Sequence, residues 1–381
     1  ITVYMNIYNG LIQDLPQRAQ LYSKLSDMDE LIRANYYGNV DSDALDANIA
    51  AGYLKGLNDE YCFYLSAEEY SDYNNTILGN VSGTGLEAEY NYETNIMTVV
   101  RVGQGSPAEQ AGIEKGDSIL KIEEEAVTAE NCASLLSLLN GEKLTSVNLS
   151  VKHISAEDGK EKVYDVSVPK GYKAPSCFYN TNGTTGYIKL TDFYENTADI
   201  FSQAMTALNA EGVTGIIIDV RNNSSNNFEF AAKVIDLIVP LATEGTGEIA
   251  TAKNAAGEII DVFSSDSESI NLPIAVLIND RTEGAAELLA CDLRDFGKAK
   301  LFGEKTAGHA TLQNVFRLED GGAVLLTVAK IFPYLSDSYD GVGVIPNETI
   351  PMSEYDKSRL SSLEISEDRQ YAAAISYLSA S

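Results

Sequence analysis

The sequence is short of several residue types, and each shortage argues against a class of function. Tryptophan is absent, histidine occurs only as His153 and His309, and 27 lysines and arginines stand against 56 acidic residues. The resulting formal charge of −29 repels nucleic acid and anionic lipid, and no basic stripe offsets it. We therefore expect no nucleic-acid partner. Two histidines are too few for a histidine-rich metal site, so we expect no metal and no cofactor.

Cysteines and long apolar runs are also scarce. The cysteines show no CxxC spacing and lie far apart, at Cys62, Cys132, Cys177 and Cys291. This spacing argues against a zinc ribbon or a redox pair and favours buried free thiols, with three pairings open if all four are oxidised. No apolar run approaches the roughly 18–20 residues of a membrane span. The chain has no signal peptide and begins at Ile1, so we expect a trimmed form whose targeting segment is absent.

What the sequence does contain is an ordinary globular composition. Its 381 residues, 44% hydrophobic and 22% charged, suffice for two or three domains with a substantial core. Residues 1–79 have a helical pattern, because apolar residues recur at every fourth position from Leu45 to Leu57 after a cap at Asp41 or Ser42. The Asn-rich stretch DYNNTILGNVSG then predicts a linker.

Two further blocks follow the linker. Residues 80–170 consist of short strands and turns, with a helix expected over 128–140 that Thr128 or a neighbour caps. In residues 171–381, buried strands alternate with helices, namely strands at 186–190, 215–220, 273–278 and 298–302 and a helix at 195–210. Runs that are apolar on both faces fit parallel strands covered on both sides. The sequence thus predicts a multidomain α/β chain with a helical N-terminal segment, a β domain and an α/β core.

The β domain carries a recognisable pattern. GTGLEAE (83–89) and GSPAEQAGIEKGDSILKIEEEAV (105–127) resemble a PDZ domain of the type found in bacterial proteases. The first two glycines allow the backbone to turn its N–H groups toward one point, which suits a terminal carboxylate, and the next strand offers an edge that an extended peptide can join. The alternative is that these glycines only shape turns. The predicted peptide-binding residues are Gly83, Thr84, Gly85, Leu86 and Glu87.

The flanking segments extend the resemblance. YLKGLNDEYCFYLSAEEYSDY (53–73) is similar to the segment that precedes the PDZ domain in carboxyl-terminal processing peptidases, also called tail-specific proteases. The core of that family is matched in order and spacing by GYIKLTDFYENTA (186–198), GIIIDVRNN (215–223), GEKTAGHATLQNVFRLEDGGAVLLTVAK (303–330) and GVGVIPNETI (341–350). The resemblance implies a core related to the crotonase and Clp-protease architecture, a serine–lysine peptidase activity, export from the cytoplasm, and protein C-termini or unfolded peptides as partners.

The catalytic positions implied by the resemblance are substituted in this chain. In the family, the stretch matching 279–287 is typically Asn-x-x-Ser-Ala-Ser-Ala-Ser-Glu, and its middle serine is the nucleophile; that position is Gly284, followed by the matching Glu287. The position of the lysine base holds His309, and the glutamine that orients the lysine in some members is kept as Gln313. The Pro-Gly-Gly loop, whose backbone N–H helps to form the oxyanion hole, is replaced by Ser224, Ser225 and Asn226.

These substitutions predict an inactive homologue that binds protein C-termini or extended peptides. Losing the nucleophile alone costs on the order of a million-fold in rate. One alternative is an active endopeptidase with a displaced nucleophile, for which the candidates are Thr282, Ser224, Ser225, or a pair of Glu283 or Glu287 with His309. A simpler role for Thr282 is to cap the following helix, and for Glu287 to favour its first turn. Another alternative is a structural partner subunit of an active relative, or a homo-oligomer.

Overall fold

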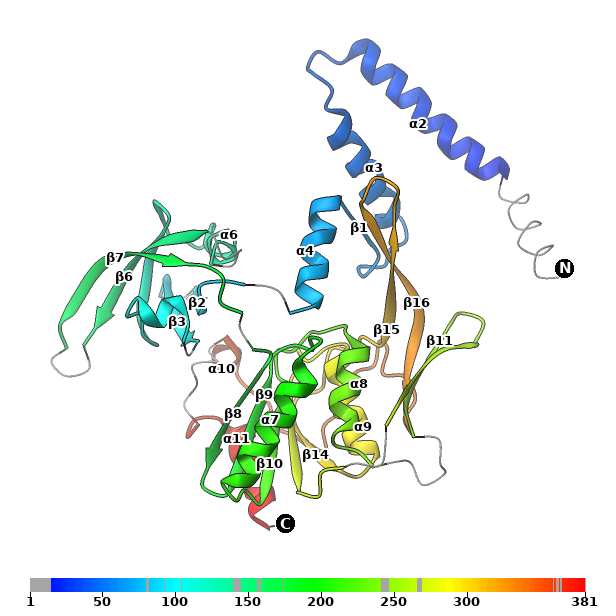
Figure 1. The fold of residues 1–381 in the computed structure, drawn as a ribbon. Coiled ribbons are helices and arrows are strands. Elements are labelled where there is room, and N and C mark those ends of the chain that lie inside the picture. Colours follow the sequence, from blue (N-terminus) through cyan, green and yellow to red (C-terminus); the bar gives the residue numbers. More distant parts are fainter. Residues whose placement is uncertain are drawn as a thin grey trace.

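The computed structural model describes residues 15–79, 82–92, 94–103, 105–139, 145–155, 159–173, 175–240, 247–265, 269–358, 360, 363 and 365–380. Within these ranges the chain forms an N-terminal helical arm, a small β domain and a larger α/β body (Figure 1). This is the multidomain α/β fold that the sequence predicts. Residues 1–14 of the predicted helical block, and residues 80 and 81 at its predicted boundary, lie outside the described residues.

The N-terminal segment contains α2 (Leu15–Asn35), α3 (Ser42–Lys55), β1 (Phe63–Leu65) and α4 (Ala67–Ile77). α3 begins after Asp41, whose carboxylate accepts the N–H groups of Asp43 and Ala44, as predicted. α4 runs through much of the stretch predicted to be a linker, so that prediction was wrong. The physical reason is a capping box, in which the Ser66 hydroxyl and the Glu69 carboxylate each accept the backbone N–H of the other residue and start a helix ahead of the Asn-rich stretch.

The β domain is one sheet with the strand order β2-β3-β4-β6-β7, so that β2 is an edge strand. Its elements are β2 (Leu86–Asn91), β3 (Ile96–Val102), α5 (Pro107–Gln110), β4 (Ser118–Ile122), β5 (Glu125–Ala126), α6 (Cys132–Ser137), β6 (Ser146–Ile154) and β7 (Glu161–Pro169). α6 is shorter than predicted and its N-cap is Asn131, not Thr128. The Asn131 side chain accepts the Thr128 N–H, so residues 128–131 form a turn before the helix.

The body is built on a six-stranded sheet with the order β17-β14-β13-β10-β9-β8, in which all neighbours except β8 and β9 are parallel. Its strands are β8 (Cys177–Asn182), β9 (Thr185–Leu190), β10 (Gly215–Asp219), β13 (Ile274–Ile278), β14 (Ala299–Gly303) and β17 (Glu348–Thr349). Its helices are α7 (Thr197–Ala210), α8 (Phe228–Asp236), α9 (Ala285–Asp295), α10 (Glu354–Ser358) and α11 (Arg369–Ala380).

Both faces of this sheet are covered, as the apolar runs predict. Ile216 and Ile218 point into one cluster with α7, α8 and α9, whereas Ile217 between them packs on the other face with Tyr371 and Leu378 of α11. The alternation follows from the period of two along a strand. Because the strands are parallel, the loops after β10 and β13 emerge at the same edge of the sheet.

A second sheet of the body joins the N-terminal segment to this edge. It has the order β1-β16-β11-β12, with β15 also paired to β16. Its further strands are β11 (Glu248–Lys253), β12 (Ile259–Ser264), β15 (Thr311–Arg317) and β16 (Ala323–Pro333). β1 pairs antiparallel to β16, so the residues just before β1 reach the segment that follows β14.

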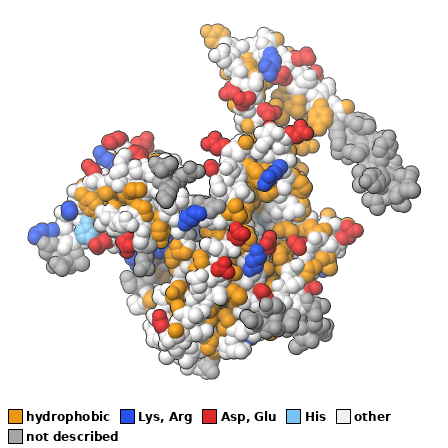
Figure 2. All heavy atoms as spheres, viewed as in Figure 1, with side chains coloured by type: hydrophobic (Ala, Val, Ile, Leu, Met, Phe, Trp, Pro, Cys, Tyr) orange, Lys and Arg blue, Asp and Glu red, His pale blue; other side chains and the backbone are white. Residues whose placement is uncertain are grey.

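The surface is mixed, and apolar side chains (orange in Figure 2) appear on the arm as well as on the body. On α2 and α3, Tyr22, Leu31 and Tyr53 are each exposed by at least 60%. All four cysteines are described, and each is a buried free thiol. In the part of the chain described here, no helix is both long and apolar enough to span a bilayer.

Candidate active site

The predicted elbow lies at the turn between β13 and α9. Gly284 is the N-cap of α9, with φ +67° and ψ −121°. An L-amino acid with a side chain rarely adopts this backbone conformation, whereas glycine adopts it without strain. We predicted that Thr282 caps this helix, and that prediction is wrong, because the N-cap is Gly284, two residues later. The turn therefore keeps the backbone of an elbow at a position that has no side chain.

The loop at 224–226 fills the space above Gly284. A Cβ atom on Gly284 would lie 2.5 Å from the Ser225 carbonyl oxygen and closer still to Asn226 Oδ1. Real Cβ atoms essentially never approach other atoms this closely. The place where a nucleophile's side chain would begin is thus occupied by this loop.

The same loop also accepts a hydrogen bond from a backbone N–H group that acyl-transfer chemistry needs as a donor. The N–H of Ala285 donates to the Ser225 carbonyl oxygen at 2.7 Å. In elbows of this kind the N–H that follows the nucleophile donates to the developing oxyanion. The Ser225 carbonyl sits where that oxyanion would be bound, so its peptide group presents an acceptor where a donor is required.

The loop is held in this position by Asn223, which is fully buried. The Asn223 side chain accepts the Ser225 N–H at 3.0 Å and donates to the Leu190 carbonyl at 3.1 Å. Its own carbonyl accepts the Glu283 N–H at 2.9 Å. The turn before α9 and the loop after β10 are therefore joined directly by hydrogen bonds on both sides of Gly284.

Glu287 ties the elbow to the segment that carries His309. Its buried carboxylate accepts the N–H groups of Gly284 at 3.0 Å, Gly308 at 2.7 Å and His309 at 2.8 Å, and it also accepts the Thr306 hydroxyl. Burial raises the pKa of Glu287 to about 7, against these hydrogen bonds, which favour the charged form. The structure thus brings positions 284 and 309 to one carboxylate, a stronger role for Glu287 than the first-turn charge predicted.

The His309 ring is enclosed rather than open to a substrate. It is 3% exposed and stacks on Tyr61 with 3.4 Å between ring centroids. Its Nε2 is 2.6 Å from Thr311 Oγ1, and its Nδ1 lies 3.2 Å from Glu283 Oε1 without hydrogen-bond geometry. Burial lowers the pKa of His309, and the neighbouring Glu283 opposes this. Of the two glutamates predicted to pair with His309, Glu283 lies next to the His309 ring, whereas Glu287 contacts only the backbone N–H of His309.

Within the described residues, Gln313 forms no hydrogen bond with the His309 ring. Its side-chain amide donates to Thr311 Oγ1 at 2.8 Å and to Thr327 Oγ1 at 3.1 Å, so Thr311 stands between the two side chains. The expectation that Gln313 orients the residue at the base position is corrected to an indirect contact. β15 has a register shift between Leu312 and Gln313, next to this contact.

The fallback nucleophiles lack the surroundings that such chemistry needs. Thr282 is fully buried, and its hydroxyl donates toward the Val220 carbonyl at 3.0 Å. Ser225 is buried, and its hydroxyl accepts the Asn227 N–H at 3.4 Å. Ser224 is exposed, but no hydrogen bond to a described imidazole or carboxylate activates it. None of the three is paired with a base in the described part of the chain.

Two residues of the site were missed by sequence reasoning. Tyr61 donates its hydroxyl to Glu283 Oε1 at 2.7 Å, across 222 positions in sequence. Tyr339 is buried and donates its hydroxyl to the Gly284 carbonyl at 2.8 Å. The match of 53–73 to the family placed Tyr61 in a relevant segment, but no local pattern pairs a tyrosine with a residue so far along the chain.

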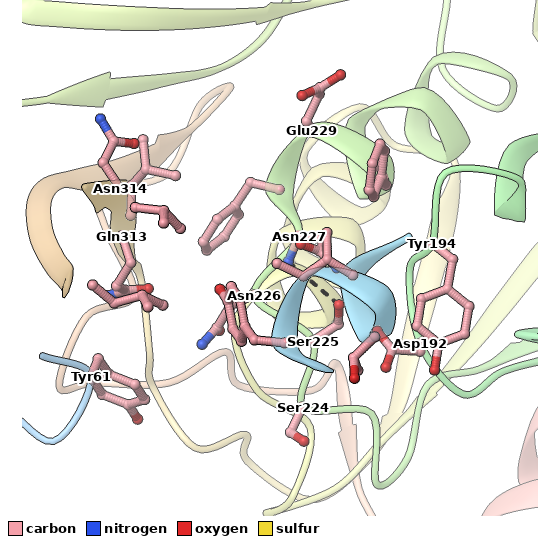
Figure 3. A pocket seen from close by; sticks show the side chains of 18 of the residues that line it. Tyr61, Asp192, Tyr194, Ser224, Ser225, Asn226, Asn227, Glu229, Gln313 and Asn314 are labelled. Carbon is pink, nitrogen blue, oxygen red and sulfur yellow. Dashed lines mark hydrogen bonds between the residues drawn. The ribbon is translucent and has the colours of Figure 1, made fainter. Parts of the chain in front are cut away.

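A cleft of about 480 Å³ opens beside this site. Figure 3 shows Ser225 and Asn226 on its floor, between Tyr61 and Gln313 on one side and Asp192 and Tyr194 on the other. Its walls come from α4, β12, β15 and the start of α8. The filled elbow therefore lies beneath a cleft that is open to ligands.

The β domain has a second groove, of about 370 Å³, which Leu86 and Ala88 of the edge strand and Leu136 and Leu139 at α6 help to line. The predicted carboxylate nest is only partly free. The N–H of Gly83 donates to the Tyr172 carbonyl, and that of Thr84 to the Leu139 carbonyl, both at 2.9 Å. Gly85 has a φ of +83°, as a turning position requires, whereas Gly83 is not in the left-handed region. The N–H of Leu86 also donates, at 3.3 Å, to the Thr84 hydroxyl oxygen, so the nest is reduced to the backbone at Gly85 and a weakly bonded Leu86 N–H.

Family comparisons match both folded parts of the chain. Residues 83–168 match the PDZ domain model, and residues 184–350 match the model of peptidase family S41. A carboxyl-terminal-processing protease of Picosynechococcus sp. (strain PCC 7002) is 30% identical over 328 residues, covering 84% of this chain and 76% of that protein. The carboxy-terminal processing protease CtpA of Bacillus subtilis (strain 168) is 28% identical over 339 residues, covering 88% and 70%.

Comparison with solved structures also finds proteases that resemble this chain. The photosystem II D1 C-terminal processing protease superposes with a TM-score of 0.51 at 25% identity, covering 88% of this chain and 90% of that one. A protein described as an S41 protease, from Bacteroides fragilis NCTC 9343, superposes with a TM-score of 0.61 at 18% identity, covering 91% of both chains, and this likeness supports the fold alone.

Proposed function

Because this chain belongs to the carboxyl-terminal processing peptidases, peptidase family S41 with a PDZ domain, we propose that it is a member that binds protein C-termini and extended peptides without cleaving them. Export from the cytoplasm, which the family resemblance implies, belongs to the same proposal. The observation that carries it is the hydrogen bond from Ala285 N–H to the Ser225 carbonyl, directly above a glycine at the nucleophile position.

Three requirements of peptide hydrolysis fail at this site for separate reasons. Gly284 has no atom to attack a carbonyl carbon, and the hydroxyl nearest to it along the chain, on Thr282, is buried and bonded elsewhere. The ring at the base position is packed on Tyr61 and bonded to Thr311. The oxyanion would meet the Ser225 carbonyl oxygen, a repulsive partner, where a donor is normally worth about 3–4 kcal/mol.

The surfaces that would hold a peptide are kept. Among the strands that the structure describes, none pairs with the outer side of β2, and apolar side chains help to line the groove next to it. An extended C-terminus can add to such an edge through main-chain hydrogen bonds. With only the Gly85 N–H and a Leu86 N–H that already donates to the Thr84 hydroxyl oxygen to receive a carboxylate, we expect weak affinity, in the micromolar range or about −8 kcal/mol.

The experiment has a catalytic arm and a binding arm. Purified protein incubated with an unfolded acidic protein, an unfolded basic protein and a C-terminally tailed peptide is expected to produce no fragments above blank. Cleavage that survives re-purification and disappears in Thr282→Ala, or in Ser224→Ala, would establish the displaced-nucleophile alternative instead.

In the binding arm, calorimetry compares one apolar-ended peptide as its free acid and as its amide. The acid is expected to bind more tightly, because a charged carboxylate accepts backbone N–H donors at this turn more strongly than the neutral carbonyl of an amide does. Equal affinity would show that no carboxylate contact operates. Failure of both forms to bind would favour a purely structural partner subunit.

A further inference from the structure

The cleft beside Gly284 has a composition that its lost chemistry does not explain. Its volume of about 480 Å³ is within the range of ligand sites. A third of its lining residues are aromatic, including Phe63, Tyr73, Tyr194, Phe228 and Phe263. These rings come from four separate segments of the chain, so the cleft is a built surface and not the side of one helix.

The charged residues of this cleft have one sign only. Asp192, Glu229 and Asp261 line it, and among the described lining residues there is no lysine, arginine or histidine. Glu229 is paired with Lys233 at 2.9 Å. Asp192 and Asp261 form no ion pair within the described residues; their carboxylates accept only the neighbouring N–H groups of Phe193 and Val262 and, for Asp192, a contact with Tyr194. Two carboxylates without a cation therefore face a cavity walled by aromatic rings.

We propose that this cleft holds an extended peptide by an arginine or lysine side chain next to a large apolar residue. A cation is attracted both by the carboxylates and by the faces of aromatic rings, and an apolar neighbour fills the remaining aromatic surface. The formal charge of −29 attracts such a segment from solution and repels acidic ones. This inference rests on the proposed function, because the segment must remain uncut.

The floor of the cleft fits the same occupant. Asn226 and Asn314 line the cleft with side-chain amides that can donate to and accept from the backbone of an extended peptide. Gln313 lines it as well, and because its N–H groups already donate to Thr311 and Thr327, it offers a peptide only its carbonyl oxygen. Because Asn226 and the Ser225 carbonyl cover Gly284, the peptide passes over the elbow and its carbonyl carbons stay out of reach. The lost active site thus becomes part of a recognition surface.

The test uses peptides amidated at the C-terminus, so that the groove of the β domain contributes little. One peptide carries Arg-Phe in its centre, a second carries Gln-Phe and a third Arg-Gly, and fluorescence anisotropy gives Kd at fixed low ionic strength. The Arg-Phe peptide is expected to bind about tenfold more tightly than either of the others. Raising the salt concentration should reduce the preference for arginine and leave the preference for phenylalanine.

A matched pair of variants locates the effect. Asp192→Asn combined with Asp261→Asn is expected to abolish the preference for arginine over glutamine. Asp165→Asn combined with Glu211→Gln removes the same charge from exposed sites outside the cleft and should keep the preference. A photoreactive phenylalanine analogue after the arginine should crosslink to β15 or the start of α8.

Two results would overturn the inference. The first is that the three peptides bind the unmodified protein with equal affinity. The second is that both double variants lose the preference for arginine equally, which would show a non-specific effect of net charge. The proposed function fails separately. It fails if the peptides are cleaved or if free-acid peptides also do not bind. Uncut free-acid peptides that bind at β2, together with no arginine preference, would leave the proposed function standing and refute only the cleft's specificity.

Discussion

Adding a single methyl group at Gly284 tests directly whether the 224–226 loop fills the elbow. In Gly284→Ala the new Cβ would lie 2.5 Å from the Ser225 carbonyl oxygen, and the residue would have to keep φ +67° and ψ −121°. Holding an L-residue in so sparsely populated a conformation costs about 1–3 kcal/mol. Overpacking a filled site costs about 1–3 kcal/mol more. The sum predicts a destabilisation of about 2–6 kcal/mol.

Gly297 provides the matched control. Its φ is also +67°, but a Cβ added there meets nothing within 4 Å. Gly297→Ala should therefore cost only about 1–2 kcal/mol, the price of the left-handed backbone. The entropy that alanine removes from the unfolded chain is the same in both variants, so it cancels in their difference. What remains measures the contact between position 284 and the loop, together with the additional strain of a side chain at ψ −121°.

The assay is thermal and urea unfolding of both variants beside the unmodified protein. For a body of this size, each kcal/mol lowers the Tm by about 2–4 °C, so Gly284→Ala should unfold several degrees below Gly297→Ala. Asn226→Gly removes one of the two clashing atoms and should recover part of the loss when combined with Gly284→Ala. If Gly284→Ala is as stable as Gly297→Ala, the loop does not occupy the elbow and the structural basis of the proposed function is refuted.

Other expected outcomes concern catalysis and pH. Gly284→Ser alone should give no turnover, and neither should its combination with His309→Lys. Adding Pro-Gly-Gly at 224–226 to this double variant should give measurable peptide cleavage. Turnover by Gly284→Ser alone would contradict the need for an open loop. Burial raises the pKa of Asp292 well above its usual range. The folded state therefore keeps this proton, and the stability it contributes is complete below about pH 4 and is lost as the pH rises toward the folded-state pKa. Asp292→Asn cannot ionise and should gain stability over the parent protein as the pH rises above about 4, in urea unfolding at several pH values; a constant difference at all pH values would refute this.

Local patterns predicted the frame of this molecule well. The runs at 215–220 and 273–278 are apolar on both faces, and they form the central parallel strands β10 and β13. The turn into α9 was predicted from the same local signals. The helix α4 was missed although its signal, Ser66 followed by Glu69, stands in the sequence, because the Asn-rich composition further along outweighed it.

The site was less predictable because its contacts join distant segments. The sequence shows that Ser224, Ser225 and Asn226 replace Pro-Gly-Gly, but not that the Ser225 carbonyl turns toward Ala285, 60 positions away. Tyr61 and His309 are further apart still, and their stacking depends on the pairing of β1 with β16. Contacts of this kind follow from the packing of whole elements and leave no periodic trace in the sequence.

The substitutions at the elbow and in the loop depend on each other. A serine at position 284 would place its Cβ against the Ser225 carbonyl, so the loop can close only when that side chain is absent. Once glycine stands there, the strained backbone relaxes, and closing the loop gains the hydrogen bond to Ala285. Glu287, Asn223 and Tyr339 still hold the turn in place, and none of them needs a reacting group to do so. Under the proposed function, stability therefore favours the closed loop once glycine stands at the nucleophile position, and we expect a working site to return only if both parts are reversed together.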